Sequence, residues 1–241
     1  MLTAVLLLFV THVVGGVAAF GSTLLALPLL LLAGWELRPA VGLLVIVGCV
    51  QAAQVAAMTW RALDRRALTQ VVVLAGAGLP VGFATAARLP QRSLGVLLGV
   101  VLVAAGASHL REQRTGRAWE PPAWVLRVLL LAGGVIHGAF GSGGATLTVY
   151  ARYVLKDKAA FRATLSTIWT VLNSFVIVGL WRSGALDHRV GVTALAGVPT
   201  VLLATWVGDW LVRRLSQEQF ARLVALLLCV AGVLTVGRNA G

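Results

Sequence analysis

The stretch "GAFGSGGATL", from Gly138 to Leu147, places four glycines and a serine inside a run of apolar residues. A second stretch, "AAFGSTLLAL" from Ala18 to Leu27, repeats the Phe-Gly-Ser core in the other half of the chain. Glycine disfavours a helix interior and leaves the backbone free to turn. Each stretch is therefore expected to end one helix and begin another within an apolar region.

The composition places these stretches in a membrane protein. Of the 241 residues, 59% are hydrophobic and 12% are charged, with a mean hydropathy of +0.92. A soluble domain carries about 25% charged residues. Runs such as 41–58 and 190–207 approach the roughly 20 apolar residues that cross a bilayer. We predict an all-α, polytopic protein embedded in the lipid bilayer, without a cleaved signal peptide because residues 1–8 carry no basic start.

Each half divides into five apolar segments. The expected segments are 2–20, 23–33, 39–60, 67–87 and 93–109 in the first half, and 125–140, 144–155, 161–181, 190–208 and 218–237 in the second. The second segment of each half is too short to cross, because an 18 Å helix does not span a hydrocarbon core of about 30 Å.

The distribution of Lys and Arg decides how these short segments run. If the first two segments of each half form one crossing, the 20 basic residues divide evenly between the two sides. If each pair enters and returns, fourteen fall on one side: Arg61, Arg65, Arg66, Arg111, Arg114, Arg117, Arg127, Arg152, Lys156, Lys158, Arg162, Arg213, Arg214 and Arg222. The uneven split favours hairpins and predicts both termini on the outer side. Because the basic residues lie at these loops, the net charge of +12 does not indicate nucleic-acid binding.

Short similarities recur in the same order in the two halves, among them "WRALD" (60–64) with "WRSGALD" (181–187) and "AGAGLP" (75–80) with "ALAGVP" (194–199). They predict a first transmembrane repeat at 1–110, a linker loop at 111–124 and a second repeat at 125–241. An odd number of passes per half inverts the second repeat. Inverted repeats with interrupted helices are typical of transporters whose substrate site lies near the membrane midplane.

The glycine breaks suggest what such a site would bind. A helix N-terminus offers free N–H groups and a positive dipole end, so it binds anions without a charged side chain. The expected substrate-binding residues are Gly21, Ser22, Thr23, Gln51, Gly141, Ser142, Gly143, Gly144, Thr146 and Asn173. The alternative is that the glycines serve only close helix packing, which suits "GLPVG" (78–82) and "GVIHG" (134–138).

Other polar residues within the apolar segments have two interpretations each. Ser166, Thr170 and Asn173 are spaced i, i+4 and i+7 on one helical face, where they could line a pathway or form interhelical hydrogen bonds. Arg162 could attract an anion to the pathway or anchor the positive side. His12 and His137 could couple proton movement to transport, or be neutral and bonded to backbone. No membrane-embedded carboxylate stands out, which suits an anion pathway.

The stretches "GGVAAFGSTLLALPLLLLAGWELRPAVG" (15–42) and "GAFGSGGATLTVYARYVLKDKAAFRATLS" (138–166) resemble the two signature copies of the sulfite exporter TauE/SafE family. The first copy has Gly-Ser-Thr at 21–23 where that family usually has a run of glycines. The resemblance implies transport of a small sulfur-containing anion, such as sulfite or an organosulfonate, across a bacterial inner membrane.

The sequence therefore predicts a secondary transporter that exports a small anion by alternating access, with no cofactor or metal. An anion channel is the first alternative and a non-transporting membrane scaffold the second. A membrane enzyme is not expected, because the four histidines are scattered and no buried acid accompanies them. No P-loop is present, so direct use of ATP is not expected either. Nothing in the sequence specifies an oligomeric state.

Overall fold

The computed structural model describes residues 2–18, 22–115, 122–155, 157–212 and part of 226–237, and this part of the chain is helical without strands. The elements are α1 (Leu2–Ala18), α2 (Ser22–Leu32), α3 (Leu37–Thr59), the 3-10 turn η1 (Trp60–Ala62), α4 (Arg65–Arg88), α5 (Gln91–Thr115), α6 (Ala123–Phe140), α7 (Gly144–Val154), α8 (Lys158–Arg182) and α9 (His188–Val212). The predicted all-α class is confirmed. Helix α5 extends to Thr115, into the linker expected at 111–124.

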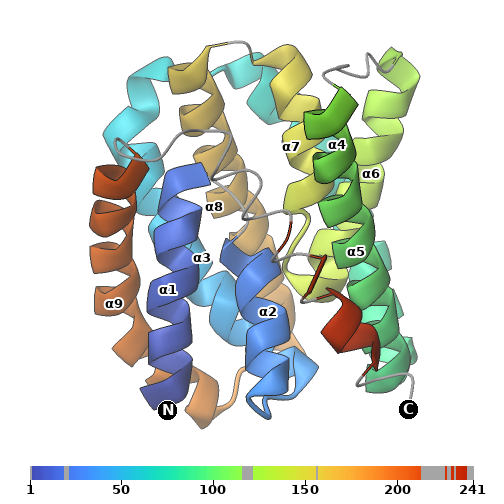
Figure 1. The fold of residues 1–241 in the computed structure, drawn as a ribbon, viewed down its shortest axis with the longest axis vertical. Coiled ribbons are helices and arrows are strands. Elements are labelled where there is room, and N and C mark those ends of the chain that lie inside the picture. Colours follow the sequence, from blue (N-terminus) through green and yellow to red (C-terminus); the bar gives the residue numbers. More distant parts are fainter. Residues whose placement is uncertain are drawn as a thin grey trace.

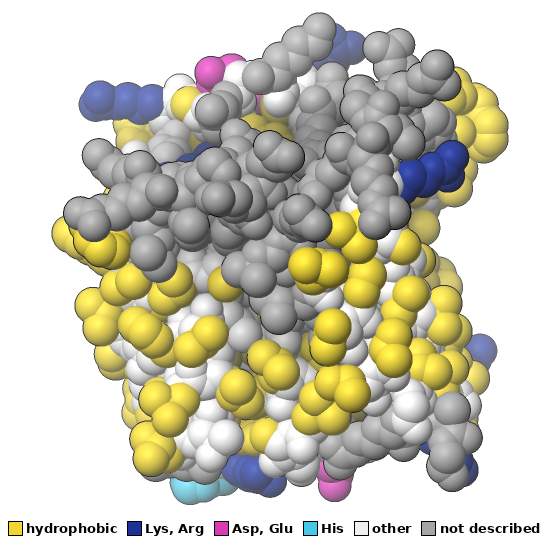
Figure 2. Space-filling view, viewed as in Figure 1, with side chains coloured by type: hydrophobic (Ala, Val, Ile, Leu, Met, Phe, Trp, Pro, Cys, Tyr) yellow, Lys and Arg dark blue, Asp and Glu magenta, His cyan; other side chains and the backbone are white. Residues whose placement is uncertain are grey.

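Within the described residues, five helical stretches are long and apolar enough to cross a membrane. They are Leu37–Ala62, Arg65–Arg88, Ala123–Phe140, Ala159–Arg182 and His188–Gly208. In Figure 2, hydrophobic side chains cover most of the described surface between the two ends of the molecule, whereas Lys and Arg lie mostly toward those ends and the edges. Apolar middles and basic ends are the pattern expected of a polytopic bundle, so the membrane assignment is confirmed.

The two short helices form hairpins with the helices that precede them. Helices α2 and α7 each have 11 residues, a rise of about 16 Å that is half of a bilayer core. Helix α1 begins and α2 ends at the lower end of the bundle, whereas α6 begins and α7 ends at the upper end (Figure 1). Each pair therefore enters and returns, as the charge distribution favours, and the hairpins come from opposite ends.

The loop aspartates that the sequence places outside the apolar segments cap the helices that follow them. Asp64 accepts a hydrogen bond from the Ala67 N–H at 2.9 Å, and Asp157 from that of Ala160 at 2.8 Å. Asp187 does the same for Val190 at 2.7 Å. These caps stabilise helix N-termini and hold the carboxylates at the ends of the bundle.

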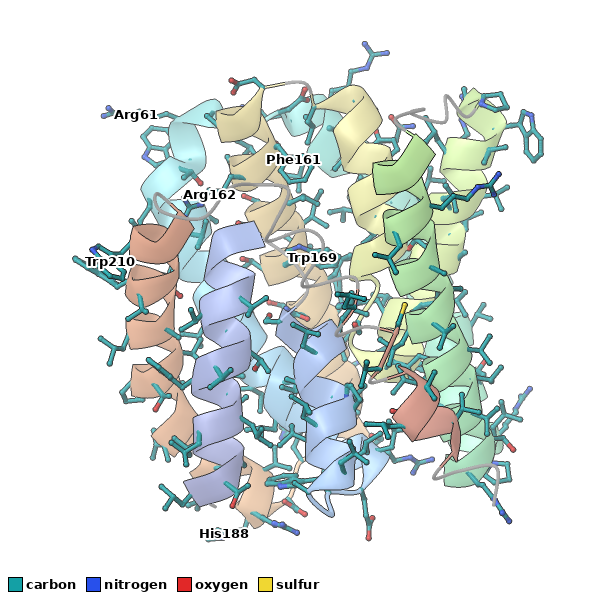
Figure 3. All side chains as sticks on the ribbon, viewed as in Figure 1. Arg61, Phe161, Arg162, Trp169, His188 and Trp210 are labelled. Carbon is teal, nitrogen blue, oxygen red and sulfur yellow. The ribbon has the colours of Figure 1, made fainter. Side chains whose placement is uncertain are left out.

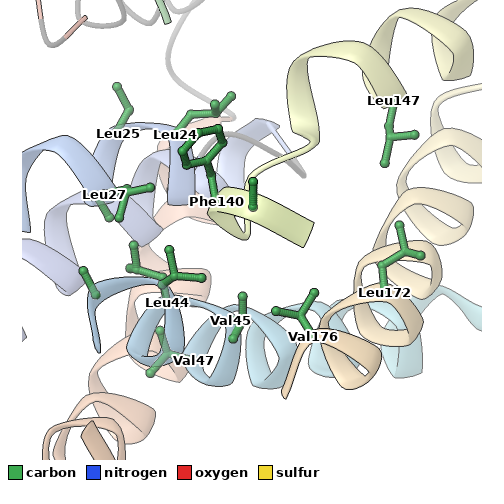
Figure 4. Close-up of a cluster of buried hydrophobic side chains, with 14 of the residues drawn as sticks. Leu24, Leu25, Leu27, Leu44, Val45, Val47, Phe140, Leu147, Leu172 and Val176 are labelled. Carbon is green, nitrogen blue, oxygen red and sulfur yellow. The ribbon is translucent and has the colours of Figure 1, made fainter. Parts of the chain in front are cut away.

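The halves pack in a reciprocal way. Helix α1 of the first half packs on α9 of the second, α6 of the second packs on α4 of the first, and α3 packs on α8. A hydrophobic cluster that includes Leu24, Val45, Phe140, Leu147 and Leu172 joins α2, α3, α6, α7 and α8 (Figure 4). The inverted relation of the two halves stays a prediction, but the exchange of α1 and α6 between them fixes both hairpins beside the central helices.

Glycines bring α4 and α6 into backbone contact, which confirms the packing role of "GLPVG" and "GVIHG". A Cβ atom at Gly78 would overlap the Leu131 carbonyl and lie 2.9 Å from the Val135 nitrogen. Likewise, a Cβ atom at Gly134 would overlap the Ala75 carbonyl. In contrast, a Cβ atom at Gly76, two residues earlier on α4, would meet nothing within 4 Å.

Gly78→Ala is therefore expected to destabilise the protein by about 1–3 kcal/mol, the usual cost of overpacking. Gly76→Ala serves as the matched control and should be neutral or slightly stabilising, because alanine is favoured over glycine in a helix. Thermal unfolding of the two purified variants in detergent measures the difference. Equal melting temperatures of the two variants would show that α4 and α6 can move apart to accommodate the added methyl group at no cost in stability.

Candidate functional site

A pocket lies where the two hairpin tips meet the central helices. Its cavity volume is about 60 Å³, several times what one water needs. Its lining comprises Gly15, Ser22, Thr23, Leu24, Gly48, Gln51, Ala52, His137, Gly141, Ser142, Gly143, Gly144, Ser166, Trp169 and Asn173. The contributions of α3 and α8 come from the middle of each helix, so the pocket lies about halfway along both spanning helices.

Most residues expected to bind substrate line this one pocket. Of the ten, eight do so: Ser22, Thr23, Gln51, Gly141, Ser142, Gly143, Gly144 and Asn173. Gly21 lies outside the described residues. Thr146 is one turn into α7 and lies outside the lining, because its hydroxyl donates to the Gly143 carbonyl at 3.1 Å. The two glycine breaks, far apart in sequence, thus meet in space.

The turn between α6 and α7 needs its glycines for two reasons. Gly141 ends α6 in the left-handed conformation with φ 61°, and its N–H donates to the His137 carbonyl at 2.7 Å. Such a conformation is costly for residues with a side chain. Gly143 lies so close to α6 that a Cβ atom would be 2.5 Å from the Gly133 carbonyl oxygen. The turn can therefore fold back on α6 only without side chains at these positions.

The turn fixes the tautomer of the neutral His137 ring. The Gly143 N–H donates to His137 Nδ1 at 3.2 Å, so Nδ1 carries no proton. In the neutral ring the proton must then be on Nε2, which becomes a donor. Nε2 is buried and has no hydrogen-bond partner among the described residues. His137 is 1% exposed and lines the pocket beside the Asn173 side chain, so its Nε2–H group faces the cavity.

Two further polar atoms at the pocket also lack partners within the described part of the chain, Ser142 Oγ and Trp169 Nε1. Trp169 lies near the centre of the bundle in Figure 3, and its ring centroid is 5.6 Å from that of His137. An indole nitrogen can only donate. A buried polar group without a partner costs about 1–3 kcal/mol, so these three groups are arranged for a ligand or water that accepts hydrogen bonds.

The electrostatics of the pocket favour an anion. No Lys, Arg, Asp or Glu is among its lining residues. The N-terminus of α7 begins at Gly144 in the lining and contributes a partial positive charge of roughly half a unit. The described residues contain no group of His, Cys, Asp or Glu suited to a metal ion. Uncharged donors at a helix N-terminus can hold an anion without the cost of a buried guanidinium.

Gln51 lines the pocket, but its amide hydrogens are already used. Nε2 donates to the His12 carbonyl at 3.1 Å and to the Thr205 hydroxyl at 2.9 Å. Gln51 therefore connects α3 to α1 and α9, and only its carbonyl oxygen remains for the cavity. Gln51 lies in the lining, as expected of a substrate-binding residue, but has no free donor for the substrate.

The structure places three other expected residues away from the lining. His12 is buried on α1, where Nδ1 donates to the Leu8 carbonyl at 2.9 Å. The Thr170 hydroxyl donates to the Ser166 carbonyl at 2.9 Å within α8. Arg162 lies nearer the upper end of α8 (Figure 3) and does not line the pocket.

Sequence reasoning missed Trp169. The pocket-facing side of α8 carries Ser166, Trp169 and Asn173, spaced i, i+3 and i+7, rather than the series through Thr170. Both series satisfy helical periodicity. The sequence does hold one signal in favour of the series through Trp169. An indole N–H in the middle of a spanning helix needs a buried acceptor, so Trp169 is expected to face a polar site.

The chain is similar to known membrane transporters. The family described as sulfite exporter TauE/SafE matches residues 4–235. A relative from Comamonas testosteroni, "Probable inner membrane transporter protein TsaS", is 24% identical over 178 residues, 73% of this chain and 74% of the relative. No solved structure matches the chain. Together with the five apolar helices, these matches show a multi-pass transporter of an inner membrane, and not an enzyme.

Proposed function

The chain belongs to the sulfite exporter TauE/SafE family, and on that premise we propose that it exports a small sulfur-containing anion, such as sulfite or an organosulfonate. The observation that carries this proposal is the set of three unpartnered polar groups, on His137, Ser142 and Trp169, around one uncharged pocket. A tetrahedral or pyramidal oxyanion offers several acceptor oxygens in a small volume. A cation would find no carboxylate in the lining.

Alternating access would use the two hairpins. The pocket is the place where they touch, since a Cβ atom at Gly144 would lie 3.7 Å from Leu24 Cδ1. Because the hairpins come from opposite ends of the bundle, withdrawal of either one would open the pocket to its own side only. Rocking of one half against the other is the usual motion of inverted-repeat transporters. The packing of α1 on α9 and of α6 on α4 would move each hairpin together with helices of the other half.

The direction of insertion follows from the basic residues. The side expected to carry fourteen of the basic residues, which includes Arg61 and Arg162 in the upper part of Figure 3, would face the cytoplasm, and both termini would lie outside. Alkaline phosphatase fused after Ala240 is expected to be active, and green fluorescent protein at the same point to be dark. The matched fusions after Thr115 should give the opposite result. Fluorescence from the terminal fusion would reverse the proposed orientation.

His137 has an alternative role, in which its protonation couples proton movement to anion transport, whereas in the proposed role it only binds the anion. The Gly143 N–H occupies Nδ1, so a second ring proton would have to break this bond and loosen the turn. The geometry therefore supports a neutral donor. If a pH gradient drives anion uptake in wild-type proteoliposomes, and a His137→Asn variant loses the effect of the gradient but still exchanges the anion at saturating concentration, proton coupling through this residue is established instead.

Anion binding tests the site directly. Purified protein is titrated with sulfite, sulfate, thiosulfate and methanesulfonate, with thermal unfolding as the readout. Trp169→Phe removes one N–H and keeps the ring, so affinity for the stabilising anion should fall roughly tenfold or more, as for a hydrogen bond to a charged group. Trp181→Phe is the matched control on the same helix, because Trp181 is 71% exposed. Ser142→Leu should fill the pocket and abolish the stabilisation.

Flux separates the carrier from its alternatives. In proteoliposomes a carrier shows saturation and counterflow, whereas an anion channel shows ohmic current. A scaffold shows neither. If an anion stabilises wild type, Trp169→Phe and Ser142→Leu equally, the pocket is not its binding site.

A further inference from the structure

A second cavity lies at the upper end of the bundle, outside the anion pocket. We call it the Arg66–Arg127 pocket. Its cavity volume is about 380 Å³, and it is lined by Asp64, Arg66, Ala67 and Gln70 at the start of α4, Ala123, Leu126 and Arg127 at the start of α6, and Tyr150 and Val154 near the end of α7. It shares no residue with the anion pocket, so what it binds is a separate question.

The charge in this pocket is positive and available. Arg66 and Arg127 are exposed, and neither forms an ion pair within the described part of the chain. The one carboxylate in the lining, that of Asp64, already accepts the Ala67 N–H as the cap of α4. At the floor, the buried Tyr150 hydroxyl donates to Gln70 Oε1 at 3.0 Å. Two guanidinium groups on neighbouring helices thus surround a cavity suited to a phosphate group.

The same two helix faces become apolar deeper in the bundle. On α6, Trp124, Arg127 and Leu131 lie at i, i+3 and i+7 on one face, where Trp124 is 66% and Leu131 40% exposed. On α4, Val73 lies seven residues after Arg66 on the same face and is 61% exposed. An exposed Trp beside an Arg marks the membrane interface, and exposed apolar residues below it contact acyl chains.

We propose that the Arg66–Arg127 pocket binds the phosphate headgroup of an acidic phospholipid, whose acyl chains lie against Val73 and Leu131. Basic pockets between helices on the positively charged side of membrane proteins bind such headgroups. A free anion would use the two arginines but would leave the apolar faces without a role. This inference does not depend on the transported substrate.

The test compares lipids on the purified full-length protein by native mass spectrometry and thermal unfolding. Wild type should retain phosphatidylglycerol in preference to phosphatidylcholine. Arg66→Gln/Arg127→Gln should lose about 30-fold in retention, at roughly fivefold for each basic residue near an anionic headgroup. Arg61→Gln/Arg65→Gln, with the same charge change at the same end but outside the lining, should retain the preference.

Two results would overturn the proposal. Equal retention of phosphatidylcholine and phosphatidylglycerol by wild type would do so whether or not the variants fold. Inorganic phosphate that displaces the retained phosphatidylglycerol from wild type, but has no effect on Arg66→Gln/Arg127→Gln, would assign the pocket to a free anion.

Discussion

His137→Asn is expected to lower the affinity for the anion by about 10- to 100-fold, as for loss of a hydrogen bond to a charged ligand, while the protein stays close to wild type in stability. The asparagine Oδ1 takes the place of ring Nδ1 and can accept the Gly143 N–H that lies 3.2 Å from it in wild type. It has no group at the position of Nε2, so the donor to the cavity is lost.

His137→Gln should have the reverse effect. The glutamine Nε2 can reach the position of ring Nε2 and donate to the anion, but nothing remains to accept the Gly143 N–H. A buried unpaired N–H costs about 1–3 kcal/mol, so the loss should appear in the melting temperature more than in affinity. Isothermal titration with the stabilising anion and thermal unfolding give the two quantities separately.

The pair of variants distinguishes a binding role from a positioning role. If His137→Asn binds as tightly as wild type and His137→Gln does not, His137 only holds the turn. If both variants lose affinity equally, the imidazole ring contributes to binding by its packing in the pocket rather than by the hydrogen bonds of either nitrogen. The expected pattern, with affinity lost in one and stability in the other, assigns each nitrogen its own function.

Much of the fold follows from the sequence because apolar length and basic residues determine a membrane bundle. The expected segments agree with the helices to within a few residues, and the count of Lys and Arg correctly favours hairpins over broken crossings. The segment expected at 218–237 lies mostly outside the described residues. What composition cannot give is which helices of one half contact those of the other, and hence that α1 packs on α9.

The site was harder to predict because its chemistry depends on hydrogen bonds rather than residue types. Gln51 and Asn173 are both expected to bind substrate, yet the Gln51 donors are engaged by His12 and Thr205. Trp169 is not among the expected residues, because the sequence alone does not show that its indole N–H faces a pocket. Free donors are a property of the folded chain, and only the surroundings of each polar atom reveal them.

Gly143→Ala is expected to reduce anion binding by about 100-fold or more. The substitution displaces two donors at once, the Nε2–H of His137 and the N–H groups at the α7 N-terminus. The added Cβ would lie 2.5 Å from the Gly133 carbonyl oxygen and 3.0 Å from His137 Cβ. Both neighbours belong to α6 and cannot move independently, so α7 must shift away from α6. The shift breaks the bond from Gly143 to Nδ1 and moves the α7 N-terminus away from the cavity.

Two other glycines make this result specific. Gly191→Ala on α9 meets nothing within 4 Å and should bind and transport as wild type does. At Gly144, an added Cβ makes only ordinary contacts, 3.7 Å from Leu24 Cδ1 and 4.0 Å from Trp169, so Gly144→Ala narrows the pocket without moving α7. Titration of the three variants and flux in proteoliposomes measure the difference. Equal losses at 143 and 144 would mean that the glycines provide only space, whereas a much larger loss at 143 means that they bring α7 close enough to α6 to orient His137.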